Sequence, residues 1–154
     1  MKITSSIEYA TRLMTTLARA HGQAPLAAER LAASDNVPAD YVSQLLSKLR
    51  RAGLVVSHRG SAGGYSLSRP PADITLGQVV RAVDGDVFED VCERYDGGDK
   101  DCRHQGGCTI SPVWQRLGTL VTSYFEGVTL AHILAEKPAD CGAAPAWLEK
   151  IAPK

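Results

Sequence analysis

The strongest constraint on the fold is a glycine-rich stretch that lies between two short runs typical of β-strands. Residues 57–64 read Ser-His-Arg-Gly-Ser-Ala-Gly-Gly, and they separate Leu-Val-Val at 54–56 from Tyr-Ser-Leu at 65–67. Glycine adopts positive φ without strain, and short β-prone runs on either side of such a stretch are typical of a hairpin. The sequence therefore predicts one antiparallel hairpin soon after Gly53.

Three helices are predicted before this hairpin. Apolar residues recur at steps of three and four over about 5–20 and from about 38 to Gly53, with a shorter helix at about 26–33 between them. Pro25 and Pro38 lie at the starts of the second and third helices, and residues 34–36 form a turn. Helix, helix, turn, helix, strand, hairpin and strand is the order of a winged helix-turn-helix.

Beyond the hairpin the sequence predicts three further helices. Asp73 or Thr75 caps a fourth helix that ends at Asp84 and Gly85, and residues 86–110 form a polar loop. Ser111 as N-cap and Pro112 at the first helical position open a long helix over about 112–128, and a short helix follows at about 130–135. The long helix carries a wide apolar stripe: Val113, Trp114, Leu117, Leu120, Val121, Tyr124, Phe125 and Val128.

The predicted fold class is mainly α with a small β-hairpin, organised as a winged helix-turn-helix plus a long dimerisation helix. Residues 1–84 form the DNA-binding domain, 85–111 a cysteine-bearing loop, 112–137 the dimerisation helix and the short helix, and 138–154 a weakly ordered tail. The stripe is too apolar for a lone surface helix. It either packs on its own domain or crosses the same helix of a second chain.

Charge and composition exclude several classes of protein. Residues 1–70 hold nine Lys and Arg against four Asp and Glu, whereas residues 71–154 hold eight against thirteen, so the N-terminal part favours a polyanionic partner. Apolar runs stay well below the ~18–20 residues that span a bilayer, and the N-terminus does not resemble a signal peptide, so we expect a cytoplasmic protein without a membrane partner. The sequence shows no catalytic triad spacing, phosphate loop or paired carboxylates, so we expect no enzyme and no small-molecule substrate.

Two groups of residues are candidates for contact with DNA. The outward face of the third helix offers groups that bond base edges or phosphates in a major groove. The hairpin offers cations beside small residues that let the backbone approach the duplex. The alternative is a solvated helix face beside an ordinary hairpin. The candidates are Ser43, Gln44, Ser47, Lys48 and Arg51 on the helix, and His58, Arg59, Gly60, Gly63 and Gly64 on the hairpin.

The cysteines indicate a metal or redox site. Cys92, Cys102 and Cys108 lie within seventeen residues of one another, and Cys141 stands apart. Soft thiolates bind zinc, copper(I) or iron–sulfur clusters, and structural zinc sites usually carry a Cys-x-x-Cys pair and four ligands, which this segment lacks. The positive end of the helix after Cys108 would stabilise an anionic cluster. An iron–sulfur cluster is favoured, while zinc and metal-free redox thiols remain open.

From residue 1 to about 135 the chain resembles the Rrf2 family of bacterial winged-helix regulators, which includes IscR-, NsrR- and RirA-like members. The resemblance rests on Tyr-Val-Ser-Gln-Leu-Leu-Ser-Lys-Leu at 41–49, Ala-Gly-Leu-Val at 52–55, and Arg59-Gly60 with Gly-Gly-Tyr-Ser-Leu at 63–67. It implies a homodimer that binds a two-fold DNA operator, usually as a repressor. It further implies base reading by Ser43 and Gln44 and insertion of Arg59 into a minor groove.

Iron–sulfur members of this family place three cysteines in the same loop, so the resemblance implies that Cys92, Cys102 and Cys108 are cluster ligands. IscR-like members carry a histidine where this chain has Ser111. In NsrR-like members a carboxylate of the other subunit completes the site, and Glu8 stands at the matching place. The resemblance implies a 4Fe–4S or 2Fe–2S cluster that responds to iron, redox state or nitric oxide. His104 is an alternative ligand and Cys141 a free thiol, whereas we expect surface or packing roles for His21, His58 and His132.

Overall fold

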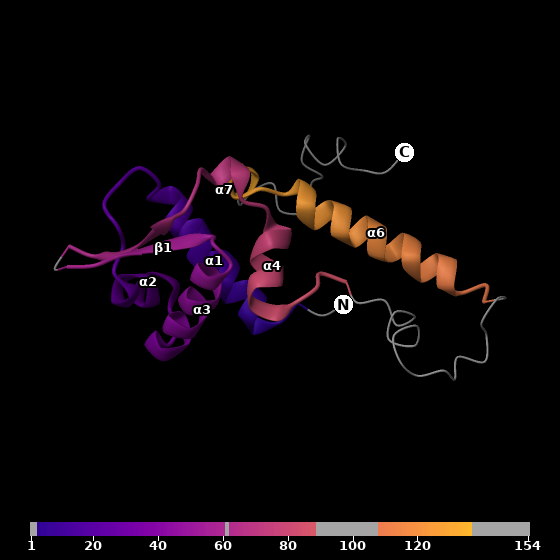
Figure 1. Cartoon of the computed structure of the whole chain (residues 1–154), viewed down its shortest axis with the longest axis horizontal. Helices are drawn as coiled ribbons and strands as arrows, with labels where there is room; N and C mark the ends of the chain where they lie inside the picture. Colours follow the sequence, from indigo (N-terminus) through magenta and orange to yellow (C-terminus); the bar gives the residue numbers. More distant parts are fainter. Residues whose placement is uncertain (1–2, 61, 89–107, 137–154) are drawn as a thin grey trace.

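The computed structural model describes residues 3–60, 62–88 and 108–136 (Figure 1). Their order confirms the predicted fold class, since the elements are helical apart from one two-stranded antiparallel hairpin. None of the described helices is long and apolar enough to span a bilayer. The elements are α1 (Ser5–Arg19), α2 (Ala28–Asp35), α3 (Ala39–Arg51), β1 (Val55–His58), β2 (Gly64–Leu67), the 3₁₀ turn η1 (Pro71–Asp73), α4 (Leu76–Asp84), α6 (Ser111–Gly127) and α7 (Leu130–Ala135).

The core lies where α1, α3 and α4 pack together. Leu13 and Met14 of α1, Leu46 of α3 and Val79 of α4 have no exposed surface. These positions follow the three- and four-residue steps seen in the sequence, so each helix turns one apolar face inward. Each such side chain contributes about 1.5–3 kcal/mol when buried. The polar faces of α2 and α3 therefore stay outside.

Local polar bonds fix where two of the helices begin. Thr4 is the N-cap of α1 and its hydroxyl accepts a hydrogen bond from the Ile7 amide. Thr75, one of the two caps predicted for α4, forms a capping box with Gln78. Asp73 instead ends the 3₁₀ turn η1.

Two predicted helix starts were wrong by one or two residues. The second helix begins at Ala28 instead of about residue 26, because the backbone of Leu26 pairs with Tyr65 of β2. Ser111 is the first residue of α6 and not its N-cap, because Ile110 already has helical dihedrals (φ −88°, ψ −35°) and takes the cap position. The N-terminus of α6 therefore has no side-chain cap.

The helix α6 projects away from the rest of the described chain in Figure 1. Phe125 and Val128 are buried at its C-terminal end, where the amide of Leu76 donates to the carbonyl of Val128 at 2.7 Å. Most of its remaining apolar stripe is exposed. Relative exposure is 56% for Val113, 43% for Trp114, 38% for Leu117, 45% for Leu120 and 41% for Tyr124.

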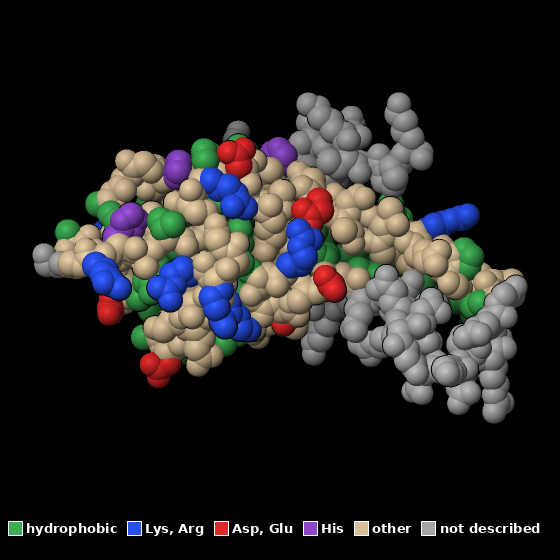
Figure 2. All heavy atoms as spheres, viewed as in Figure 1, with side chains coloured by type: hydrophobic (Ala, Val, Ile, Leu, Met, Phe, Trp, Pro, Cys, Tyr) green, Lys and Arg blue, Asp and Glu red, His purple; other side chains and the backbone are tan. Residues whose placement is uncertain are grey.

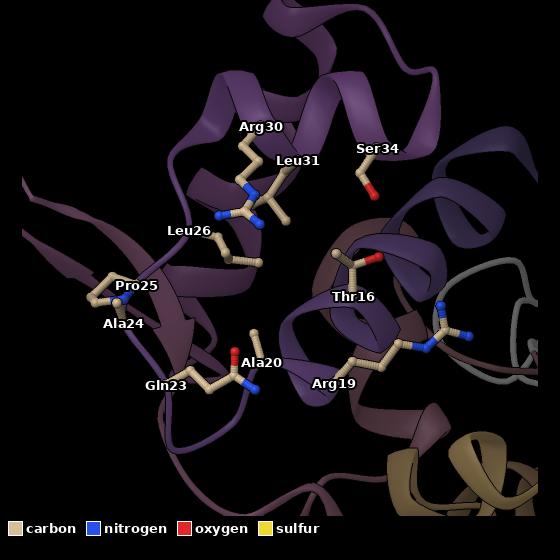
Figure 3. A pocket seen from close by; sticks show the side chains of 10 residues that line it. All are labelled: Thr16, Arg19, Ala20, Gln23, Ala24, Pro25, Leu26, Arg30, Leu31 and Ser34. Atoms are coloured by element: carbon tan, nitrogen blue, oxygen red, sulfur yellow. The ribbon is translucent and has the colours of Figure 1, made fainter.

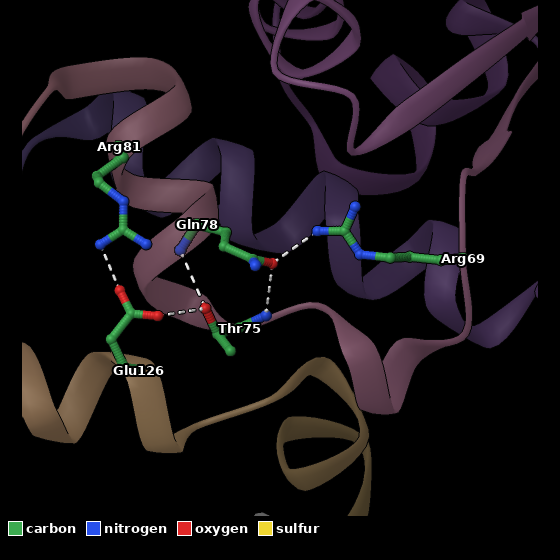
Figure 4. A network of polar contacts seen from close by, with 5 residues as sticks. All are labelled: Arg69, Thr75, Gln78, Arg81 and Glu126. Carbon is green, nitrogen blue, oxygen red and sulfur yellow. Dashed lines mark hydrogen bonds and ion pairs between the residues drawn. The ribbon is translucent and has the colours of Figure 1, made fainter.

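A polar network joins the C-terminal end of α6 to the domain body (Figure 4). Glu126 forms an ion pair with Arg81 of α4 and accepts a hydrogen bond from the Thr75 hydroxyl at 3.0 Å. Gln78 accepts from the Arg69 guanidinium at 2.8 Å. Hydrogen bonding to Arg81 lowers the pKa of Glu126 from its usual value, although partial burial opposes the shift.

We expect Glu126→Gln to lower the free energy of unfolding by about 1 kcal/mol at pH 7, an amount already reduced for solvent screening. A carboxylate whose pKa is lowered in the folded state stabilises the protein above its unfolded pKa, and this contribution is lost as pH falls through the folded pKa. Urea unfolding at about pH 7 and pH 3 should therefore show a larger difference at the higher pH. Glu29→Gln on exposed α2 should change neither value. An equal loss at both pH values would contradict the assignment.

Candidate functional site

The exposed face of α3 presents the polar residues that were predicted to read bases. Val42, Leu45 and Leu49 are buried, which turns Ser43 and Gln44 to solvent. The Ser43 hydroxyl donates to the carbonyl of Ala39 at 3.1 Å and keeps its lone pairs free to accept. Among the described residues nothing bonds the amide of Gln44, so both its donor and its acceptor face outward. Ser47 is half-buried one turn further on.

The three cations in the last turn of α3 have different surroundings. Arg51 is exposed with no partner among the described residues, and Arg50 reaches the Ser57 hydroxyl at 3.5 Å. Lys48 is half-buried, and its ammonium donates to the carbonyl of Val83 in α4 at 2.8 Å. The sequence placed Lys48 with the DNA contacts, whereas the structure gives it an internal partner that sequence periodicity does not reveal.

The hairpin places Arg59 near its tip. The strands pair from Val55 opposite Leu67 to His58 opposite Gly64, and Arg59 follows β1 directly, exposed and without a described partner. The His58 ring bonds the Ser66 hydroxyl at 2.9 Å across the strands. The candidate residue His58 is therefore partly engaged within the hairpin, and Arg59 is its free cation.

The hairpin glycines have structural reasons that do not depend on DNA. Gly60 has φ 108°, which favours glycine, and the amide of Gly63 donates to its carbonyl at 2.9 Å. A Cβ at Gly63 would overlap the carbonyl oxygen of His58, and one at Gly64 would overlap the backbone of Leu26. Gly64 thus permits the paired backbone bonds between Leu26 and Tyr65, at 2.9 and 2.8 Å, that tie the hairpin to the α1–α2 loop. This pairing of Leu26 with Tyr65 was not predicted from the sequence. Gly64 is the residue in the sequence that could have indicated such a close backbone approach.

Basic side chains outnumber acidic ones on α3 and the hairpin, where Lys48, Arg50, Arg51 and Arg59 face one acidic residue, Asp40. Figure 2 shows Lys and Arg side chains over the part of this face formed by α2, α3 and α4. A cavity of about 360 Å³ lies between α1 and α2. Figure 3 shows its lining, where the Arg30 guanidinium lies beside Leu26 and Leu31. Arg19 lines the same cavity, and neither arginine has an acidic partner among the described residues. The observed charge matches the polyanion partner expected from the sequence.

The candidate metal ligands are described only in part. Cys92, Cys102, His104 and Cys141 lie outside the described residues. Cys108 is a free, half-buried thiol three residues before α6, and Glu8 is exposed in the first turn of α1, where it pairs with Arg12 at 2.5 Å. Within the described ranges no three His, Cys, Asp or Glu side chains form a metal site. His132 takes part in the capping box of α7, and His21 is exposed.

Two of the candidate ligands, Cys108 and Glu8, are described, and their donor atoms are of types that bind metal ions. Cys108 supplies a soft sulfur donor, and the uncapped N-terminus of α6 leaves positive helix-dipole charge beside it. Glu8 has one carboxylate oxygen that is not engaged by Arg12. Its exposure leaves it accessible to a second chain.

Comparisons with known proteins agree with this geometry. The family described as "Rrf2: Iron-dependent Transcriptional regulator" matches residues 3–136. The transcriptional regulator IscR of Aliivibrio salmonicida is 32% identical over 136 residues, which cover 88% of this chain and 79% of that protein. The solved structure of T. potens IscR has a TM-score of 0.70 at 27% identity and covers 97% of this chain and 96% of its own.

A second group of solved structures concerns a cysteine regulator. CymR of B. subtilis, described as the global cysteine regulator, has a TM-score of 0.68 at 30% identity, covering 86% of this chain and 95% of its own. Staphylococcus aureus CymR, solved in an oxidized form, has a TM-score of 0.67 at 27% identity, covering 89% and 98% of the two chains.

Proposed function

The chain belongs to the Rrf2 family of transcriptional regulators, and from this premise we propose that it binds a two-fold DNA operator as a homodimer, with an iron–sulfur cluster setting its affinity. The family is one of regulators and not of enzymes. The observation that carries the proposal is that Cys108 lies three residues before α6, whose side chains Val113, Trp114, Leu117 and Leu120 are exposed within the described chain. The proposed metal ligand Cys108 and the proposed subunit interface on α6 are therefore neighbours in the sequence.

DNA reading is assigned to α3 and to the hairpin. Ser43 and Gln44 would contact base edges in the major groove, with Ser47 and Arg51 beside them. Arg59 would enter the minor groove, and Gly60, Gly63 and Gly64 hold the hairpin backbone in the shape that presents it. His58 would contact the sugar–phosphate backbone of the DNA near Arg59. We propose that the usual outcome of binding is repression.

The stripe of α6 supports the homodimer. Five large apolar side chains that are each more than a third exposed would meet their counterparts on a second copy. A two-fold dimer places its two reading helices about one DNA turn apart, near 34–36 Å. The operator would then be a pseudo-palindrome.

Cys92, Cys102 and Cys108 would hold the cluster, and Glu8 of the second subunit would complete it. When bound, the cluster supplies an iron- and redox-sensitive link between these ligands, and it is either 4Fe–4S or 2Fe–2S. Arg12 pairs with the Glu8 carboxylate in the first turn of α1. Because the ligand groups come from both chains, their bonding would fix α1 of one subunit relative to α6 of the other.

Anaerobic purification tests this proposal. Iron and acid-labile sulfide should be present with visible absorbance, and the loaded and apo forms should differ in affinity for an operator selected from random duplexes. Glu8→Ala should alter the visible spectrum, whereas Glu29→Ala, the exposed first-turn glutamate of α2, should not. Equal operator affinities of loaded and apo protein would exclude the cluster as the switch.

Thiol sensing without a metal is the second candidate function, and zinc stabilisation of the regulator is the third. The similarity to CymR in an oxidized form favours thiol sensing, because Cys108 is also a free thiol. Colourless, iron-free protein that loses operator affinity with peroxide and regains it with a thiol reductant would support this second function. Colourless protein with one zinc per chain would support the third.

Substitution of Gln44 and Arg59 should separate base reading from general attraction. We expect Gln44→Ala to lose about 1–3 kcal/mol of preference for the operator over unrelated DNA, without change in its binding to unrelated DNA. Arg59→Ala should weaken both and reduce the salt dependence of binding by about one phosphate equivalent. Fluorescence anisotropy with operator and scrambled duplexes measures these effects. A Gln44→Ala protein that keeps full preference would contradict base reading by that side chain.

A further inference from the structure

Lys48 occupies an unusual place for a cation on a reading helix. Its side chain is half-buried, and its ammonium donates to the carbonyl of Val83 at 2.8 Å. Val83 is the penultimate residue of α4, and the last carbonyls of a helix lack partners within it. They also carry the negative end of the helix dipole, so a lysine ammonium is a favourable partner for them. Arg51, one turn further along α3, has no such partner.

The segment that Lys48 contacts is where the chain leaves α4 toward the cysteines. We call residues 83–88 the α4 exit. The Thr4 hydroxyl, at the N-cap of α1, donates to the Asp84 carboxylate at 3.2 Å. Val87 is buried in the core, and a Cβ at Gly118 of α6 would lie 2.7 Å from the Phe88 ring, so Phe88 packs on α6. Cys92 follows Phe88 by four residues.

Three helices therefore contact the α4 exit, each with a different role under the proposed function. The α1 helix carries Glu8, α6 carries the dimer stripe, and α3 reads DNA. The hydrogen bond from Lys48 is the polar link between this segment and α3. A shift of the Val83 carbonyl changes that bond directly, without a change in any residue that touches DNA.

We propose that Lys48 is a positioning residue that transmits the state of the cysteine segment to α3, and that it is not a phosphate contact. This inference rests on the proposed function, because the state transmitted is the occupancy of the cysteines. Loss of the bond to Val83 removes this polar restraint while the apolar packing of α3 on α4 remains, and it alters the angle at which Ser43 and Gln44 meet the groove. The two cations on α3 thus have different roles: Arg51 attracts the DNA duplex, and Lys48 orients α3.

Salt dependence and cluster response distinguish these two roles. Operator affinity is measured by fluorescence anisotropy over a series of salt concentrations, for apo protein and for protein loaded with equal iron per chain. The variants are Lys48→Met, the matched control Arg51→Met, and Lys48→Arg, which keeps a cationic donor. Far-UV circular dichroism and a thermal melt establish that each variant is folded at the working temperature.

The salt slope is the slope of the logarithm of operator affinity against the logarithm of salt concentration. For Lys48→Met we expect this slope to be unchanged. The ratio of loaded to apo affinity should move at least threefold toward one. Arg51→Met should keep the wild-type ratio and lose about 0.9 from the salt slope, the value for one phosphate contact. Lys48→Arg should retain most of the wild-type ratio. A Lys48→Met protein that loses about 0.9 from the slope and keeps its ratio would show that Lys48 contacts phosphate, which overturns the inference.

Two other outcomes distinguish failure of the inference about Lys48 from failure of the proposed function. If Lys48→Arg loses the ratio as fully as Lys48→Met, the bond to the Val83 carbonyl is not the link, and the inference is overturned while the proposed function stands. If wild-type protein holds no iron and its affinity ratio is one, the proposed function fails and the transmission fails with it.

Discussion

Replacing both Leu117 and Leu120 with glutamate will convert the protein to a monomer and weaken operator binding by at least about 100-fold, because two linked half-site contacts become independent. Both side chains lie on the exposed stripe of α6, at 38% and 45% exposure. Burying a carboxylate in an apolar interface without a partner is strongly unfavourable, so the subunits should separate. The fold of each subunit should survive, because neither leucine belongs to the core.

The matched control places the same charges on the other side of the helix. Gln115 and Thr119 lie on the opposite face of α6 by its 3.6-residue period, and both are exposed. Sedimentation velocity should find Gln115→Glu with Thr119→Glu as a dimer, with operator affinity close to that of wild type. If the Leu117 and Leu120 variant also sedimented as a dimer, the stripe would not be the subunit interface.

Cys108→Ala should abolish cluster binding, whereas Cys141→Ala should not. A cluster ligand that is replaced by a methyl group leaves an iron without its thiolate, and even removal of an outer hydrogen-bond partner of a metal site commonly costs 10–100-fold in metal affinity. We therefore expect at least about tenfold less iron and sulfide per chain after anaerobic purification of Cys108→Ala. The operator affinity of this variant should equal that of the wild-type apo protein, whether the cluster raises or lowers that affinity.

Cys141 provides the control because it lies apart from the other three cysteines and the sequence predicts it to be unligated. Iron analysis and visible spectra of the Cys141→Ala protein should match those of wild type. If removal of Cys108 left iron and sulfide intact, the ligand set would have to be drawn from other residues. If both single variants kept their metal and that metal was zinc, the cluster would be excluded.

Periodicity predicted the core helices because α1, α3 and α4 each bury a continuous apolar face. Leu13, Met14, Leu45 and Leu46 all lie in the core at the positions that the three- and four-residue steps indicate. The hairpin was predicted from its glycines, and Gly60 does adopt the positive φ that makes glycine necessary there. These elements are specified locally, so a single sequence suffices to locate them.

The errors and omissions concern contacts between distant segments. The start of α2 differs from the predicted one because Leu26 pairs with Tyr65. The hydrogen bond from Lys48 to Val83 joins residues 35 positions apart. Both depend on where two elements meet after folding, and neither leaves a periodic pattern. The cap of α6 was misplaced because the backbone angles of Ile110, and not the identity of Ser111, decide where the helix begins.

The buried contacts of α6 lie at its C-terminal end, with Phe88 against Gly118 near its middle, and this has a mechanical consequence for its N-terminal end. The helix has 17 residues, so at about 1.5 Å per residue it is some 25 Å long. Rotation by about ten degrees around the Glu126 junction would carry the far end, next to Cys108, through roughly 4 Å by this geometry. Under the proposed function, a small rearrangement at the junction would therefore appear as a larger displacement beside Cys108. Under the proposed function, substitutions at Thr75 or Arg81 would accordingly change the response of operator affinity without replacing a thiol or a residue of α3.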